Sequence, residues 1–174
     1  MILIIGGAYQ GKLAYALDRF NLSAGDVYRC GEFSAAVPEH KKMIYEIDKW
    51  ILALIKADEE TTAAAANAVT DANADTTDSA APDPIAAASV STADSSAAPV
   101  TPVTRSDAVA VSLKQFIGRN PDAIVICNDI SCGVVPYDAI QRKCREAVGR
   151  SLAELSRRSD EVIRLFCGIP SKIK

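Results

Sequence analysis

A glycine-rich segment near the start of the chain has the residue types and spacing of a phosphate-binding loop. Gly6 and Gly11 are separated by four residues and Lys12 follows directly, which gives the pattern Gly-x-x-x-x-Gly-Lys. The glycines let backbone N–H groups turn toward phosphate oxygens, and the lysine ammonium reaches the β- and γ-phosphates of a nucleotide. The spacing predicts a catalytic Lys12 within a nucleotide site made of Gly6, Gly7, Ala8, Tyr9, Gln10, Gly11, Lys12 and Leu13.

The residue after this lysine departs from the phosphate-loop pattern. The position usually carries Ser or Thr, whose hydroxyl binds Mg²⁺, and here it is Leu13, which has no atom that can ligate a metal. We therefore expect GTP or ATP as the substrate, with any Mg²⁺ held without the usual hydroxyl, and we predict no metal site made by the protein. A bare tight turn is the alternative, because glycines also serve turns that bind nothing.

The apolar pattern of the chain places this loop in an α/β fold. Short apolar runs at residues 2–5 and 122–127 predict buried strands, and so do weaker ones at 26–29 and 161–167. Helical patterns follow the loop and cover residues 38–54, 109–118 and 137–158, while residues 168–174 read as a tail. Alternating strands and helices predict a P-loop-type parallel sheet flanked by helices.

A polar turn follows the strand predicted at residues 122–127. Its first residues are Asn128 and Asp129, and the ligands of parallel sheets bind at the carboxyl ends of the strands. The glycine loop follows another strand at that same edge. Asp129 is therefore the second candidate catalytic residue, able to orient an acceptor hydroxyl or to hold Mg²⁺ through water.

Residues 58–106 differ in composition from the rest of the chain. They are rich in Ala, Thr, Ser, Asp and Pro, and they contain neither an aromatic residue nor a leucine. Such a segment buries too little apolar surface to offset its loss of conformational entropy. We expect a disordered insertion over residues 58–106, inside one α/β nucleotide-binding domain formed by residues 1–57 and 107–174.

Composition excludes some classes of partner. The net charge of −3 gives no general attraction to nucleic acid, and no run of about 18 apolar residues predicts a membrane span. Five cysteines without a Cys-x-x-Cys pair, beside a single histidine, favour reduced thiols over a zinc site. These features together predict a cytoplasmic protein.

The strand predicted at residues 122–127 and the turn after it carry a specific likeness. Residues 125–136 read Val-Ile-Cys-Asn-Asp-Ile-Ser-Cys-Gly-Val-Val-Pro, which resembles the V-x-x-N-E-V-G-x-G-I-V-P stretch of the adenosylcobinamide kinase / adenosylcobinamide-phosphate guanylyltransferase family of cobalamin biosynthesis. Residues 4–12 resemble the opening of that family. The likeness extends without gaps to the C-terminus through Arg142, Arg145-Glu146, Gly149-Arg150, Leu155, Asp160-Glu-Val162 and residues 168–174.

The resemblance implies two linked reactions and a role for the single histidine. Members of the family phosphorylate a hydroxyl of cobinamide, a corrinoid, with ATP or GTP and then transfer GMP to the new phosphate through a guanylylated histidine. His40 lies roughly where the family carries that histidine, and an imidazole can form a phosphoramidate with an α-phosphate. By this resemblance His40 is the third candidate catalytic residue, with a solvated histidine in a helix's first turn as the alternative.

Departures from the family pattern leave other functions open. The family's central strand, which bears an acidic residue, should fall within residues 58–106, where the sequence is of low complexity instead. A sheet that lacks this strand would favour pairing of subunits as a homo-oligomer. The alternatives to an active enzyme are a degenerate homologue that binds nucleotide or corrinoid with little turnover, and an interaction module with an acidic flexible loop.

Overall fold

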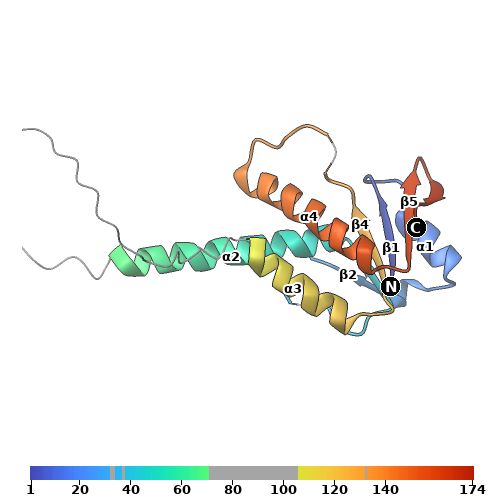
Figure 1. Cartoon of the computed structure of the whole chain (residues 1–174), viewed down its shortest axis with the longest axis horizontal. Helices are drawn as coiled ribbons and strands as arrows, with labels where there is room; N and C mark the ends of the chain where they lie inside the picture. Colours follow the sequence, from blue (N-terminus) through green and yellow to red (C-terminus); the bar gives the residue numbers. More distant parts are fainter. Residues whose placement is uncertain (32–33, 37, 71–105, 132) are drawn as a thin grey trace, which may run out of the picture.

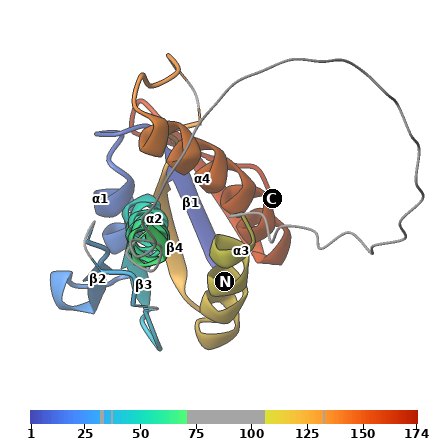
Figure 2. The ribbon, with the colours of Figure 1, turned by 90° about the vertical axis from the view of Figure 1, so that its left-hand side faces the viewer.

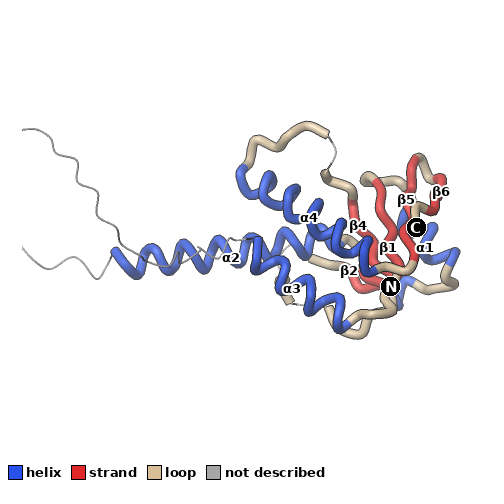
Figure 3. Tube along the Cα trace, viewed as in Figure 1, coloured by secondary structure: helices blue, strands red, loops and turns tan. Residues whose placement is uncertain are grey.

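The chain forms an α/β fold in the computed structural model, with one sheet between helices (Figures 1 and 2). The structure describes residues 1–31, 34–36, 38–70, 106–131 and 133–174. Strands and helices alternate along most of the chain, as Figure 3 shows. The predicted fold class is confirmed.

The sheet has six strands in the order β2-β3-β4-β1-β5-β6. Every neighbouring pair is parallel except β5 and β6, which are antiparallel. The strands are β1 (Ile2–Gly6), β2 (Val27–Arg29), β3 (Met43–Tyr45), β4 (Ile124–Asn128), β5 (Glu161–Phe166) and β6 (Ile169–Lys172). The helices are α1 (Lys12–Arg19), α2 (Ile47–Thr70), α3 (Ser106–Arg119) and α4 (Ala139–Arg158), with a 3₁₀ turn at Ala24–Asp26.

The central strands are buried on both faces, which explains their nearly continuous apolar sequences. Successive side chains of a strand point to opposite faces, so Leu3 and Ile4 enter different layers of the core. Leu3 packs with α2, α3 and α4, where the rings of Trp50 and Phe116 lie 5.4 Å apart. Ile4 belongs to the layer beneath α1, which contributes Ala16.

A strand stands where the sequence pattern predicted the first part of a helix. Residues 38–46 are not helical, because Met43 and Ile44 are fully buried on opposite faces of the sheet as part of β3. Glu46 then takes a positive φ of 62°, which separates the strand from α2. The family's central strand was expected within residues 58–106; of these, 58–70 and 106 are helical and 71–105 lie outside the described residues.

Two other predicted boundaries also move. Helix α2 continues to Thr70, so residues 58–70 are helical rather than part of a disordered insertion; alanine favours helix, and Lys143 of α4 contacts Glu59. The remainder of the predicted insertion, residues 71–105, lies outside the described residues. Residues 169–172 form the edge strand β6 in place of a tail.

Among the described residues, no helix is long and apolar enough to cross a membrane.

Candidate functional site

The glycine-rich loop joins the carboxyl end of β1 to the N-terminus of α1, as its spacing predicted. A Cβ atom on Gly6 would lie 2.6 Å from the carbonyl oxygen of Leu165 in β5, so only glycine fits between these strands. Gly11 precedes α1 with a positive φ of 75°, a conformation that glycine adopts without strain. The loop thus brings the positive N-terminal end of α1 to the edge of the sheet.

Lys12 is buried at this helix N-terminus, with 4% of its surface exposed. Its Nζ donates a hydrogen bond of 2.6 Å to the carbonyl oxygen of Gly7, so the side chain folds back across the loop. Burial lowers the pKa of Lys12, and the nearby charges of Asp48 and Glu46 act in the opposite direction. An ammonium group held in this way can neutralise a phosphate that enters the loop.

Asp48 lies close to this lysine and was not identified from the sequence. It sits in the first turn of α2, nine-tenths buried, and its carboxylate accepts hydrogen bonds from the backbone N–H of Asn128 at 3.1 Å and from its Nδ2 at 3.0 Å. The signal that could have found it is its position just after a strand. That signal was hidden because β3 was taken for helix.

Asp129 lies at the same edge, directly after β4. Its backbone N–H donates to the carbonyl oxygen of Gly6 at 2.9 Å, which joins the polar turn to the first residue of the phosphate loop. Its Oδ1 accepts from the N–H of Ser131 at 3.3 Å and from the hydroxyl of Ser131 at 2.5 Å. Its Oδ2 lies 3.7 Å from a guanidinium nitrogen of Arg164.

Leu13 is partly buried beside the phosphate loop. It packs against the apolar layer beneath α1, so this position contributes to the stability of the fold and offers no oxygen to a metal. Among the described residues, no three His, Cys, Asp or Glu side chains lie close enough together to hold a metal ion. Asp48 and Asp129 are each engaged by protein donors. This donor set does not fit a resident Mg²⁺.

Cys127 is the last buried residue before the polar turn. Its Sγ lies 3.3 Å from the carbonyl oxygen of Asn128, and the side chain is fully buried. Burial raises the pKa of Cys127 well above its ordinary value, which keeps the thiol protonated. It therefore belongs to the core and offers no nucleophile to the site.

His40 lies at the opposite edge of the sheet from Lys12 and Asp129. The chain then reaches Lys42, just before β3. The carbonyl oxygen of Lys42 accepts a hydrogen bond from the backbone N–H of Ile124, the first residue of β4. Strand β1 crosses the sheet from that edge to Gly6, a distance of about 13 Å over four residue steps. The structure thus places Lys12 and Asp129 at the same edge of the sheet and His40 at the opposite edge.

Apolar side chains gather on the loops that leave the carboxyl edge. Tyr9 of the phosphate loop and Val134, Val135 and Tyr137 of the segment after β4 are all exposed. Beside this segment is a pocket of about 460 Å³, bordered by Ser131, Val135 and residues of α4. Exposed apolar side chains and the basic side chains of α4 therefore lie at this edge.

One comparison with known proteins connects this geometry with a family. The family model described as cobinamide kinase / cobinamide phosphate guanyltransferase matches residues 2–173, nearly the whole chain. The match confirms the resemblance found in the sequence. No curated protein matches the chain significantly.

Proposed function

The chain belongs to the cobinamide kinase / cobinamide phosphate guanyltransferase family, and on this premise we propose that it transfers the γ-phosphate of GTP or ATP to a hydroxyl of cobinamide. The observation that carries the proposal is the buried Lys12, which lies across the phosphate loop at the N-terminus of α1. Phosphoryl transfer needs mainly positioning and neutralised charge, and both are provided at this edge of the sheet.

In the proposed reaction the loop residues hold the nucleotide. The backbone N–H groups of residues 6–11 and the ammonium of Lys12 receive the β- and γ-phosphates. Lys12 keeps two donors beyond its bond to Gly7, because an ammonium group carries three. Asp48 and Glu46 support its positive charge, which burial alone would disfavour.

Asp129 takes the second role in this proposal. Its backbone N–H is bonded to the first residue of the phosphate loop, and its carboxylate orients the acceptor hydroxyl. The hydroxyl oxygen attacks the γ-phosphorus, the bond to the β–γ bridging oxygen breaks with its electrons leaving on that oxygen, and the hydroxyl proton passes to Asp129. The exposed apolar side chains beside the loop, Tyr9 and Tyr137 among them, fit a bulky corrinoid acceptor.

The second reaction of the family, guanylyl transfer, would depend on His40 and not on the phosphate loop. As a proposal, His40 would carry GMP as a phosphoramidate, but its position at the amino edge requires a nucleotide bound away from the phosphate loop. Incubation with GTP labelled at the α-phosphate tests this. Acid-labile label on the natural protein that is lost in His40→Ala supports the role, and equal labelling of both proteins excludes it.

A second candidate function is a homologue that binds nucleotide with little turnover. Leu13 favours it, because the usual Mg²⁺ hydroxyl is replaced by a side chain that packs in the core. The third alternative, an interaction module, depended on residues 58–106. Of these, 58–70 belong to α2 and 71–105 lie outside the described residues, so no observed geometry supports it.

Calorimetric titration with GTP and with ATP, with and without Mg²⁺, separates these functions. We expect binding that is lost in Lys12→Ala and kept in Lys42→Ala, whose exposed ammonium pairs with Asp26 far from the loop. Formation of cobinamide phosphate by the natural protein supports the kinase. Binding without product supports the weak homologue, and an absence of binding excludes both.

A further inference from the structure

Arg145 of α4 donates hydrogen bonds to the segment that follows Asp129. Its Nε and Nη2 donate to the carbonyl oxygen of Ser131 at 3.0 and 2.6 Å. Its Nη2 also donates to the carbonyl oxygen of Gly133 at 3.0 Å, and its Nη1 donates to that of Val134 at the same distance. One guanidinium therefore holds three carbonyl groups, those of Ser131, Gly133 and Val134.

Ser131 carries this restraint to the carboxylate of Asp129. While its carbonyl group is held by Arg145, its N–H and its hydroxyl both donate to Oδ1 of Asp129. The N–H and the hydroxyl of Ser131 thus hold one oxygen of the carboxylate, while Arg145 holds the carbonyl group of the same residue. Arg145 on α4 is therefore connected to the carboxylate of Asp129 through one intervening residue, Ser131.

Asp129 in turn is tied to the phosphate loop and to β5. Its backbone N–H donates to Gly6, and its Oδ2 faces the guanidinium of Arg164 on the other side. A contiguous set of contacts therefore runs from α4 to the loop that contains Lys12. Arg145 is the only member of this set that reaches back from α4, in the part of the chain that the structure describes.

We propose that Arg145 is a positioning residue for phosphoryl transfer, which holds the carboxylate of Asp129 in place through Ser131. The inference rests on the proposed function, because Asp129 there orients the acceptor hydroxyl and takes its proton. A misplacement of a catalytic group such as this carboxylate by about 1 Å costs about 100-fold in rate. The hydrogen bonds from Arg145 to Ser131 therefore affect the rate although Arg145 does not touch the substrate.

The side-chain chemistry explains why this position holds arginine. A guanidinium presents five N–H donors in a rigid planar fork, and Arg145 directs four hydrogen bonds from it to the segment. A lysine would offer one ammonium on a flexible stem and could not hold three separate carbonyl groups. Arg150, five residues further along α4, pairs with Glu146 in the contacts described, and it supplies a matched control.

Hydrogen exchange followed by NMR tests the positioning directly and needs no activity. In Arg145→Ala the N–H groups of Ser131 and Asp129 should exchange at least about tenfold faster, while that of Val125 in β4 stays protected. Arg150→Ala should leave all three unchanged. Unchanged protection of Ser131 and Asp129 in Arg145→Ala would overturn the proposal, whether or not the protein proves to be a kinase.

A double-mutant cycle on the kinase reaction tests the consequence for catalysis. Arg145→Ala should lower kcat by about 10- to 100-fold with an unchanged Kd for the nucleotide, and Arg145→Lys should restore only part of the rate. In an Asp129→Ala background the further loss from Arg145→Ala should vanish, because the carboxylate is no longer there to be positioned. Full additivity of the two losses, or loss of nucleotide binding in Arg145→Ala, would overturn the proposal. A natural protein without kinase activity would instead defeat the proposed function, and the exchange experiment would still decide the role of Arg145.

Discussion

Asp48 holds both amide groups of Asn128, since its carboxylate accepts from the backbone N–H and from the side-chain Nδ2 of that residue. The two residues come from different parts of the chain, the first turn of α2 and the last residue of β4. These hydrogen bonds hold the first turn of α2 at the carboxyl end of β4, next to the phosphate loop.

Asp48→Asn should weaken the fold at this point. An amide cannot accept from both groups of Asn128 without bringing two NH₂ groups face to face, so we expect a loss of about 1–3 kcal/mol in the free energy of unfolding. Urea denaturation measures it. Asp122→Asn, on an exposed turn, is the control and should change stability by less than about 0.5 kcal/mol. Equal effects of the two substitutions would contradict the role given to Asp48.

Two glycine-to-alanine substitutions should change stability in opposite directions. Gly6→Ala places a Cβ 2.6 Å from the carbonyl oxygen of Leu165, and we expect a loss of about 1–3 kcal/mol together with loss of nucleotide binding. Gly149→Ala, inside α4 with no atom within 4 Å of the new Cβ, should gain roughly 0.5–1 kcal/mol. Thermal unfolding and calorimetry check both. Intact nucleotide binding in a stable Gly6→Ala protein would contradict the described loop.

Because of Lys12, the free energy of unfolding and the nucleotide affinity should both change with pH in the alkaline range. Its pKa in the folded protein is lowered from the ordinary 10.5, mainly because of burial, so the unfolded chain binds more protons between the two values. The free energy of unfolding should therefore rise with pH from the lowered pKa up to about 10.5, then level off. Nucleotide affinity should fall over the same range, because the neutral amine attracts phosphate less. Denaturation and calorimetry of the natural protein at several pH values measure the two effects, and Lys12→Met should abolish the pH dependence of the stability.

Leu13→Ser tests whether the missing hydroxyl limits the site. Removing this partly buried leucine should cost about 1–2 kcal/mol of stability, and the new hydroxyl should make nucleotide binding tighter with Mg²⁺ than without it. Leu17→Ser is the matched control, since Leu17 packs in the same layer one turn later. It should cost similar stability without creating a dependence on Mg²⁺. The same response to Mg²⁺ in both variants would remove Leu13 as the cause.

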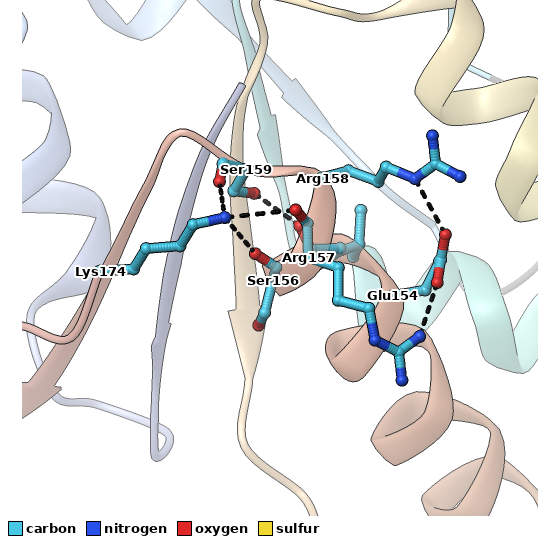
Figure 4. A network of polar contacts seen from close by, with 7 residues as sticks. Glu154, Ser156, Arg157, Arg158, Ser159 and Lys174 are labelled. Atoms are coloured by element: carbon cyan, nitrogen blue, oxygen red, sulfur yellow. Dashed lines mark hydrogen bonds and ion pairs between the residues drawn. The ribbon is translucent and has the colours of Figure 1, made fainter.

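Lys174 should stabilise the end of α4, and Figure 4 shows its contacts. Its Nζ donates to the carbonyl oxygens of Ser156 at 3.2 Å, of Arg157 at 3.2 Å and of Ser159 at 2.6 Å, groups that the end of the helix leaves without partners. Lys174→Met should lower the free energy of unfolding by about 1 kcal/mol. Lys172→Met on the exposed edge strand should have a smaller effect, and chemical denaturation compares the two variants.

Much of the fold was predictable, because the central strands are apolar on both faces and the long helices have apolar stripes. The strand β3 was missed since Met43, Ile47 and Trp50 fit a helical spacing that continues into α2. The choice between the two depends on hydrogen bonds to β4, which a local pattern cannot contain. Asp48 was missed for the same reason.

The candidate site was predictable where it depends on neighbours in sequence. The spacing of Gly6, Gly11 and Lys12 located the loop, and the position of Asp129 after a strand located the facing turn. The remoteness of His40 was not predictable, because it follows from β3 beginning just after it. The grip of Arg145 on Ser131 depends on how α4 folds back over the turn that precedes it.

The order of the strands shows that the first and second halves of the chain build the sheet together. Strand β4, from the second half of the chain, is inserted between β3 and β1 of the first half, and β1 in turn lies between β4 and β5. Neither half can build the central layer alone. If the backbone were cut between residues 70 and 106, fragments 1–70 and 106–174 would each lack the strands that complete the other. They should therefore associate with one another and fold together, as a split protein does.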